Sequence, residues 1–236
     1  MLVVEGLTKS YRDVIALDSV SLVAGEGQVT AVVGANGAGK TTLFSILAGI
    51  IEPDAGSCHL DGTAQASWPR RSVGYLAAEP FFYDRLTGAQ TVRFERTMRG
   101  IDVSDEQIDL LLDQWGAATF AHKRLGALSQ GMRKRVLMAA AFLGEPKLVV
   151  LDEPLNGLDV QGVLLLKDAL SRGRACGTHI LMCSHVLDFV QGYADRAVLL
   201  DGGRVIRELD PAAESLEQAY RREVLDDDGR ARRASS

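Results

Sequence analysis

One segment near the N-terminus limits the possible folds more than any other part of the chain. Residues 28–33 are a short, largely β-branched run, which is typical of a buried parallel strand. Residues 40–48 form a helical pattern with one apolar face, and Gly49 is placed to end that helix. The loop between them reads GANGAGKT and fits the pattern G-x-x-x-x-G-K-[ST]. A strand, this loop and a helix in that order predict a phosphate-binding loop in an α/β domain.

The residue types in this loop explain why it would hold phosphate. Gly34, Gly37 and Gly39 allow backbone N–H groups to converge on phosphate oxygens without a Cβ in the way. The helix that follows directs its unpaired N–H groups and the positive end of its dipole at the same anion. Lys40 is expected to reach the terminal phosphates, and the Thr41 hydroxyl to coordinate Mg²⁺. The alternative is a glycine-rich turn that matches the pattern by chance.

Two further strands are predicted to end in chemically active side chains. Residues 148–151 are an apolar run that predicts a buried central strand, and Asp152 and Glu153 follow it directly. Open α/β sheets bind ligands at the carboxyl ends of their strands, and paired acids there need a cation or water network to offset their desolvation. Residues 180–184 form another strand pattern that ends at His185. The alternatives are two surface acids and a structural histidine.

Composition narrows the functional class. A chain of 236 residues suits one large α/β domain with a subdomain, and a net charge of −5 gives no basic footprint for nucleic acid. Three cysteines without paired or metal-ligand spacing favour a reduced compartment. No signal peptide is recognisable, and no run approaches the roughly 18 apolar residues that a membrane span requires. If the protein works at a membrane, another subunit must span it.

The remaining patterns divide the chain. Residues 2–33 alternate short β-type runs with turns, which predicts a small, partly antiparallel sheet. Residues 80–145 are helical, with capping boxes at Thr87 and Ser104 and a third helix from Ser129, and this block is interpreted as an insertion into the sheet domain. We therefore expect one domain over 1–210, followed over 211–236 by a polar, solvated helix and a disordered tail from residue 226.

Several short motifs, taken with the phosphate loop, resemble the nucleotide-binding subunit of ATP-binding cassette (ABC) transporters. The resemblance covers residues 1 to about 210, and the order of motifs is similar to that of bacterial exporter-type subunits. The matching motifs are LSQGM at 128–132 for the signature, LVVLDEP at 148–154 for the Walker B strand, NGLD at 156–159 for the D-loop, His185 for the switch histidine and Tyr11 for the adenine-stacking aromatic.

The resemblance implies a fold and a mechanism. The fold would be a P-loop NTPase (RecA-like) α/β sheet core with an antiparallel β subdomain and an inserted α-helical signature subdomain at about 80–145. Two subunits would close head-to-tail around two ATP molecules with Mg²⁺, so that each site joins the phosphate loop of one chain to the signature of the other. The chain would then be a Mg²⁺-dependent ATPase that powers transport through separate membrane subunits.

The same resemblance assigns roles to individual residues. Glu153 would act on the attacking water and His185 on the γ-phosphate, while Thr41 and Asp152 would hold Mg²⁺. Asp159 would cross the interface between the two chains. The ATP-binding residues would be Tyr11, Gly34, Ala35, Asn36, Gly37, Ala38, Gly39, Lys40, Thr41 and Thr42 in one chain, with Ser129, Gln130, Gly131 and Asp159 supplied by the other.

Two departures from the family pattern stand out. Ala78 occupies the position of a glutamine that normally contacts Mg²⁺ and the water, with Glu79 beside it. In the signature, Gln130-Gly131-Met132 replaces the usual Gly-Gly-Gln. The first change bears on hydrolysis and coupling, and not on ATP binding.

The resemblance also implies partners and a location. A membrane transporter subunit would contact the region of Phe81, Phe82 and Tyr83, unless these aromatics pack inside the subdomain. The second partner would be another nucleotide-binding subunit, identical or different, and no nucleic acid is expected. The chain would be cytoplasmic and peripheral at the inner face of the cell membrane.

Two other functions remain open. A soluble ABC-type ATPase that acts on DNA or ribosomes usually carries a long coiled coil or two cassettes, and this chain has neither heptads nor an internal repeat. A regulatory module that dimerises on ATP but hardly hydrolyses it is favoured by Ala78 and opposed by Glu153 and His185. Tyr11 likewise has an alternative role as a half-buried anchor of its sheet.

Overall fold

A computed structural model gives the structure of residues 1–225; the tail predicted to be disordered, 226–236, lies outside the described residues. The centre is a six-stranded sheet in the order β10-β9-β3-β8-β7-β6. Neighbouring strands are parallel throughout, except that β10 is antiparallel to β9. The strands are β3 (Val29–Val33), β6 (Val73–Leu76), β7 (Leu148–Asp152), β8 (His179–Cys183), β9 (Arg196–Asp201) and β10 (Arg204–Leu209).

The central strands are buried on both faces, which explains their continuous apolar runs. Every residue of β3, β7 and β8 is buried. Along β7, Val149 and Leu151 join one hydrophobic cluster, whereas Leu148 and Val150 join the other. The sheet therefore separates two cores, one on each face.

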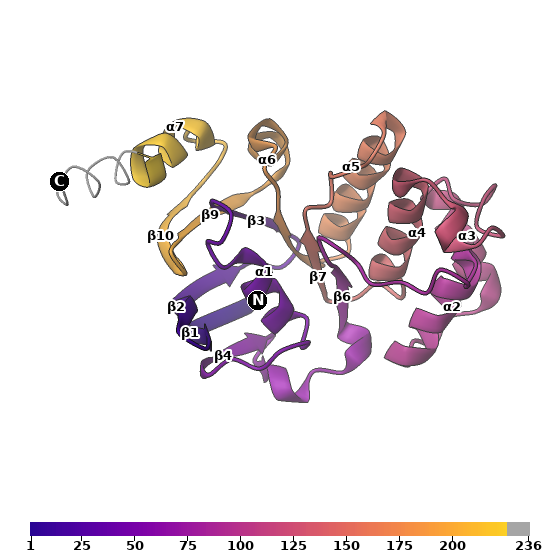
Figure 1. Ribbon diagram of the computed structural model, residues 1–236, viewed down its shortest axis with the longest axis horizontal. Helices are drawn as coiled ribbons and strands as arrows, with labels where there is room; N and C mark the ends of the chain where they lie inside the picture. Colours follow the sequence, from indigo (N-terminus) through magenta and orange to yellow (C-terminus); the bar gives the residue numbers. More distant parts are fainter. Residues whose placement is uncertain (226–236) are drawn as a thin grey trace.

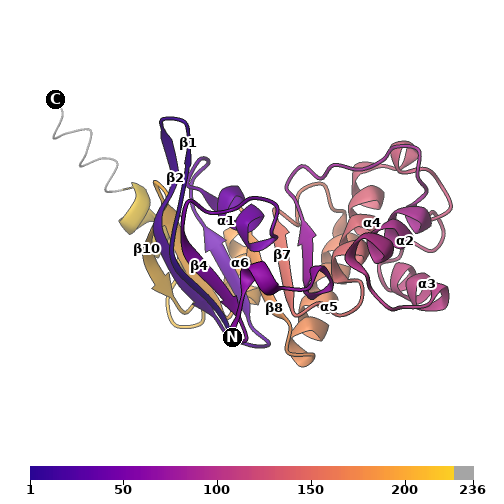
Figure 2. The same ribbon diagram turned by 90° about the horizontal axis from the view of Figure 1, so that it is seen from below.

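A smaller antiparallel sheet covers one of these faces. Its strand order is β2-β1-β4-β5. The helix α1 (Lys40–Leu47) packs between the two sheets, with Leu43, Phe44 and Ile46 in the cluster that both sheets share (Figure 2). This is the predicted antiparallel subdomain, built from β1 (Leu2–Tyr11), β2 (Val14–Ala24), β4 (Ala55–Leu60) and β5 (Thr63–Ala64).

The helical insertion stands at one end of the molecule (Figure 1). It contains α2 (Gly88–Arg99), α3 (Asp105–Gln114) and α4 (Gln130–Phe142) around the fully buried Trp115. Both predicted capping boxes are present, at Thr87 and Ser104. The helices α5 (Val160–Ala175) and α6 (Leu187–Tyr193) follow β7 and β8, and single 3₁₀ turns are η1 (Gln65–Ser67), η2 (Arg70–Ser72) and η3 (Leu125–Ala127).

The C-terminal segment differs from the solvated helix that was expected over 212–224. It forms α7 (Leu216–Tyr220) and a π turn, η4 (Arg221–Leu225). Leu216 and Ala219 are fully buried, and the Leu216 N–H donates to Gln191 Oε1 of α6 at 2.7 Å. Few apolar residues suffice to dock so short a segment, which is why its polar composition was misleading. Within residues 1–225, no helix has both the length and the apolar content needed to cross a membrane.

Candidate functional site

The predicted phosphate loop follows β3 and turns sharply into α1. Gly37 and Gly39 have φ of 82° and 105°, in the left-handed region that favours glycine. At Gly34 a Cβ would overlap the carbonyl of Leu200, and at Gly39 it would overlap that of Ala16. Gly34 and Gly39 are therefore required by close backbone packing, and Gly37 and Gly39 by the turn. Asn36 and Gly37 lie exposed at the tip of the loop.

Lys40 and Thr41 begin α1 and face different partners. Lys40 is 9% exposed, and its Nζ donates to the carbonyls of Gly34 and Ala35 at 2.8 and 2.9 Å. The Thr41 hydroxyl donates to Asp152 Oδ2 at 2.8 Å, which joins the loop helix to the end of β7. A hydroxyl and a carboxylate converging at this distance are the hard oxygen donors that Mg²⁺ prefers. Thr41 and Asp152 therefore fit the magnesium ligands assigned from the sequence.

Asp152 has a second partner that the sequence analysis missed. Cys183 ends β8 in register with Asp152, and its thiol donates to Asp152 Oδ1 at 2.8 Å. Burial raises the pKa of Cys183, and the nearby charge of Asp152 raises it further. The thiol therefore stays protonated and serves as a hydrogen-bond donor. In the sequence, the position of Cys183 near the end of a strand pattern, two residues before His185, could have indicated this contact.

Glu153 and His185 meet at the same edge of the sheet. His185 Nε2 lies 2.9 Å from Glu153 Oε1, and the backbone N–H of His185 donates to Glu153 Oε2 at 3.4 Å. The Glu153 side chain is largely buried, whereas that of His185 is 54% exposed. Glu153 also has φ of 50°, a strained conformation for a residue with a Cβ, and such strain is often found at active sites. The parallel strands β7 and β8 thus bring together two residues that the sequence separates widely.

Lys134 of α4 is the second contributor that sequence reasoning missed. In the basic triplet 133–135, Lys134 and Arg135 are only 6% and 7% exposed. The Lys134 ammonium donates to the carbonyls of Glu153 and Asn156 at 2.5 and 2.9 Å. Burial lowers the pKa of Lys134 to about 8, although the charges of Glu153 and Asp152 oppose this change. A charged triplet inside an otherwise apolar helical pattern was the available signal.

The signature residues lie at the N-terminus of α4. Ser129 caps the helix by accepting from the Met132 N–H at 3.3 Å, and Ser129 and Gln130 are exposed. Gly131 packs closely against the turn after β7, so that a Cβ on Gly131 would lie 2.9 Å from the carbonyl oxygen of Gly157. Asp159 caps α5 through Gly162, with its other oxygen 3.7 Å from Arg135 Nη2. The predicted signature and D-loop therefore contact one another within one chain.

The signature and the phosphate loop belong to opposite faces of the sheet. The residues of α1 pack with Leu148 and Val150, whereas those of α4 pack with Val149 and Leu151. The structure thus brings together the assigned catalytic and magnesium residues with the phosphate loop. It leaves Ser129, Gln130, Gly131 and Asp159 outside that cluster.

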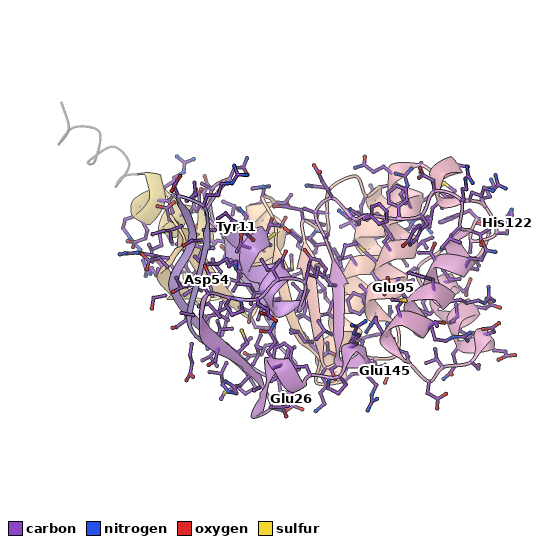
Figure 3. The ribbon with its side chains drawn as sticks, turned by 60° about the horizontal axis from the view of Figure 1, so that its bottom comes forward. Tyr11, Glu26, Asp54, Glu95, His122 and Glu145 are labelled. Carbon is purple, nitrogen blue, oxygen red and sulfur yellow. The ribbon has the colours of Figure 1, made fainter. Side chains whose placement is uncertain are left out.

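Tyr11 and Ala78 lie at the margins of this site. Tyr11 pairs with Val14 to close the β1–β2 hairpin and is 47% exposed (Figure 3), an exposure that fits either of its two expected roles. Ala78 follows β6 and lines, with Glu79 and Phe81, a groove of about 1410 Å³ between the sheet core and the helical insertion. Thr42, also assigned to ATP, is half-buried in the first turn of α1.

The three aromatics after β6 do not behave alike. Phe81 and Tyr83 are 85% and 52% exposed and meet edge to face, with ring centroids 5.4 Å apart. Phe82 instead packs against the core, and the Arg133 guanidinium lies 4.3 Å from its ring centroid. The exposed apolar surface is therefore formed by Phe81 and Tyr83.

Comparison with known proteins identifies the family. Residues 17–156, more than half of the chain, match the family described as "ABC transporter". The chain belongs to the ABC transporter family. Among its relatives, the lantibiotic transport ATP-binding protein SrtF of Streptococcus pyogenes is 32% identical over 226 residues, covering 95% of this chain and 98% of that protein.

Solved ABC structures confirm the predicted fold. The ATP-binding subunit of an ABC transporter is 29% identical, with a TM-score of 0.81 over 94% of this chain and 92% of that one. A dimeric ATP-binding cassette in a post-hydrolysis state with ADP and Pi is 22% identical, with a TM-score of 0.79 over 89% and 99% of the two chains. At that identity the second likeness shows the fold alone. The ABC family, its P-loop α/β fold and the role of ATP-binding subunit are thus confirmed.

Proposed function

We propose that this ABC subunit is a Mg²⁺-dependent ATPase that powers transport through separate membrane subunits by ATP-driven, head-to-tail dimerisation. The convergence of Thr41, Asp152, Glu153 and His185 at one edge of the sheet carries this proposal. The carboxyl ends of β3, β7 and β8 meet there because these strands are parallel.

Each side chain has a distinct task in hydrolysis. The phosphate loop and the N-terminus of α1 bind the phosphates, with Lys40 as the cation nearest to them. Thr41 and Asp152 would hold Mg²⁺, which would supply positive charge to stabilise the phosphate oxygens. Glu153 would accept the proton of the attacking water, and His185 orients the Glu153 carboxylate through their 2.9 Å contact. The His185 ring is exposed and would also contact the γ-phosphate.

A second chain completes each site. The signature of α4 lies across the sheet from α1, so the chain's own signature is separated from its own phosphate loop. The exposed helix N-terminus at Ser129 is suited to an anion, and a closed pair with twofold symmetry would present it to the partner's ATP. The dimeric, post-hydrolysis form of the structurally similar cassette supports this arrangement. Tyr11 would stack on the adenine from the hairpin tip.

The groove beside Ala78 is the proposed contact with the membrane subunit. Exposed apolar side chains at its rim, Phe81 foremost, mark an interaction surface. The segment 77–79 joins that groove to the end of β6 in the catalytic sheet, and so offers a direct link between partner and site. Attachment there would hold the chain in the cytoplasm at the inner face of the cell membrane. The relative SrtF is named a lantibiotic transport ATP-binding protein, which supports a role in transport; the contact at this groove is our proposal.

ATP turnover by the purified chain tests the assignment. Replacing Glu153 by Gln should lower kcat by about 10²–10⁴, because it removes a positioned general base. ATP should still bind and close the dimer, which gel filtration with ATP would detect. Removal of Mg²⁺ with a chelator should abolish turnover in the wild type.

Glu145 supplies a matched control, since it is also a glutamate with a positive φ, 49°, but is exposed in the loop between α4 and β7. Glu145→Gln should leave kcat unchanged. Normal turnover in Glu153→Gln would refute the catalytic role. A wild type that binds Mg²⁺-ATP and dimerises without turnover would instead support a regulatory module, the function that Ala78 favours.

A further inference from the structure

The ammonium of Lys134 is buried and bound to neutral groups. It is 6% exposed, and the two acceptors at hydrogen-bond distance are the backbone carbonyls of Glu153 and Asn156. Lysine is almost never buried to this extent unless it is paired, because desolvation of the charge is costly. The two hydrogen bonds to these carbonyls offset that cost here.

Both carbonyls belong to the turn that leaves the catalytic strand. The Asn156 N–H donates to the Glu153 carbonyl at 3.3 Å, so Glu153 and Asn156 are the two ends of one turn. Lys134 binds both ends of it. Glu153 has φ of 50°, and the orientation of its carboxylate toward His185 depends on that backbone conformation. Bonds to these carbonyls therefore hold the direction of the Glu153 side chain.

Lys134 is the member of its triplet directed at this turn. Arg133 donates to the carbonyls of Leu125 and Leu128 inside the helical insertion. Arg135 donates to Gln161 Oε1 on α5 at 3.1 Å. Lys134 thus links α4, the helix that carries the signature, to the backbone of the chain's own Glu153. The close contact of Gly131 with the Gly157 carbonyl also restricts movement of α4 relative to this turn.

We propose that Lys134 is a positioning residue for ATP hydrolysis, which holds the Glu153 carboxylate in its working orientation and ties that orientation to the position of α4. The proposal rests on the role of Glu153 given above. In the proposed dimer, the ATP held by the second subunit lies against the signature of this chain. A shift of α4 on binding that ATP would then change the orientation of this chain's Glu153 through Lys134.

Lys134→Met tests the proposal, because it keeps the unbranched stem and removes the ammonium. We expect kcat to fall by up to about 100-fold, the cost of a misplaced catalytic group, while the Kd for Mg²⁺-ATP stays unchanged because Lys134 is not part of the phosphate loop. The midpoint of thermal unfolding is recorded for each variant. Lys134→Gln keeps a neutral NH2 donor group on a shorter stem, and it should recover part of the lost kcat.

Arg174→Met is the matched control. Its guanidinium donates to Asp195 Oδ2 at 3.0 Å and to the Tyr193 carbonyl, so this variant also loses two bonds of a cation, but at the far end of α5. It should lower the unfolding midpoint and leave kcat unchanged. A kcat for Lys134→Met equal to that of the wild type, or equal losses in both Met variants, would overturn the positioning role.

Glu153→Gln, measured in the same series, separates the two proposals. If Glu153→Gln retains turnover, the proposed function itself fails. If Glu153→Gln is inactive while Lys134→Met is fully active, only the role of Lys134 fails. If Lys134→Met is too unstable to purify, Lys134→Gln decides: a lower kcat at unchanged Kd supports the proposal, and a normal kcat overturns it.

Discussion

Burial controls the chemistry of individual residues in this protein, and the cysteines show it most directly. Cys58 and Cys183 are buried, whereas Cys176 is exposed. Burial raises the pKa of Cys58 to about 12, from an ordinary value of 9.0. In the folded chain Cys58 therefore keeps its proton well above the pH at which the unfolded chain would release it.

This difference predicts a loss of stability in alkali. Between about pH 9 and 12 the unfolded state binds fewer protons at Cys58 than the folded state, so the free energy of unfolding must fall as pH rises. The slope is up to about 1.4 kcal/mol per pH unit for this thiol. Cys58→Val should remove that part of the slope in urea unfolding measured below and above pH 9.

Cys176→Ser is the control, because it removes a thiol that is exposed and not buried. Equal slopes in the wild type and Cys58→Val would contradict the prediction. The opposite sign, with stability rising in alkali more steeply in the wild type, would contradict the assigned direction of the pKa change.

At the scale of elements, two helices of the insertion begin with the same kind of serine N-cap, but the two caps have different roles. Ser104 caps α3 through the Gln107 N–H, and Ser129 caps α4 through the Met132 N–H, both at 3.3 Å. In α3 the cap belongs to a capping box that serves folding. In α4 it lies in the signature, at the proposed contact with a second chain's ATP.

Replacing each serine by alanine separates these roles. Ser104→Ala and Ser129→Ala should each lower the free energy of unfolding by about 1 kcal/mol, the usual value of an N-cap. We expect a loss of ATP-driven dimerisation and turnover in Ser129→Ala alone. Retained dimerisation in Ser129→Ala, measured by light scattering with ATP in a Glu153→Gln background, would argue against the shared site.

At the scale of the whole molecule, a groove lies between the sheet core and the helical insertion, and Phe81 is exposed on its rim. Glu95 of α2, labelled in Figure 3, also lines the groove. Phe81→Ser should leave the ATPase activity of the isolated chain unchanged but reduce its recovery with membranes. The experiment uses a tagged chain expressed in its cell of origin in place of the native copy.

Leu110→Ser is the control for this change. Leu110 lies on α3 and is 64% exposed, so both variants remove a large exposed apolar side chain from the insertion. Recovery of Leu110→Ser with membranes should match the wild type. An equal loss for both variants, or no loss for Phe81→Ser, would place the membrane contact elsewhere.

The sequence predicted the features that depend on local residue patterns, and it missed those that depend on contacts between distant segments. The phosphate loop, the ends of β7 and β8 and both capping boxes follow from short-range patterns, and the structure has them where they were expected. The bonds of Lys134 to the turn after β7, and of Cys183 to Asp152, join distant segments that no spacing rule connects. For the same reason the sequence did not separate the inward Phe82 from the exposed Phe81.

The close packing of the signature against the turn after β7 limits which segments can be exchanged between related chains. A Cβ on Gly131 would press on the Gly157 carbonyl, and one on Gly157 would lie 2.5 Å from Gln130 Cδ. These two segments must therefore change together when parts are exchanged between homologues. A chimera that takes residues 80–145 from a relative should hydrolyse ATP only if residues 153–159 come from the same relative. In a gene-shuffling library that exchanges the two segments independently, the active clones should carry both segments from the same parent.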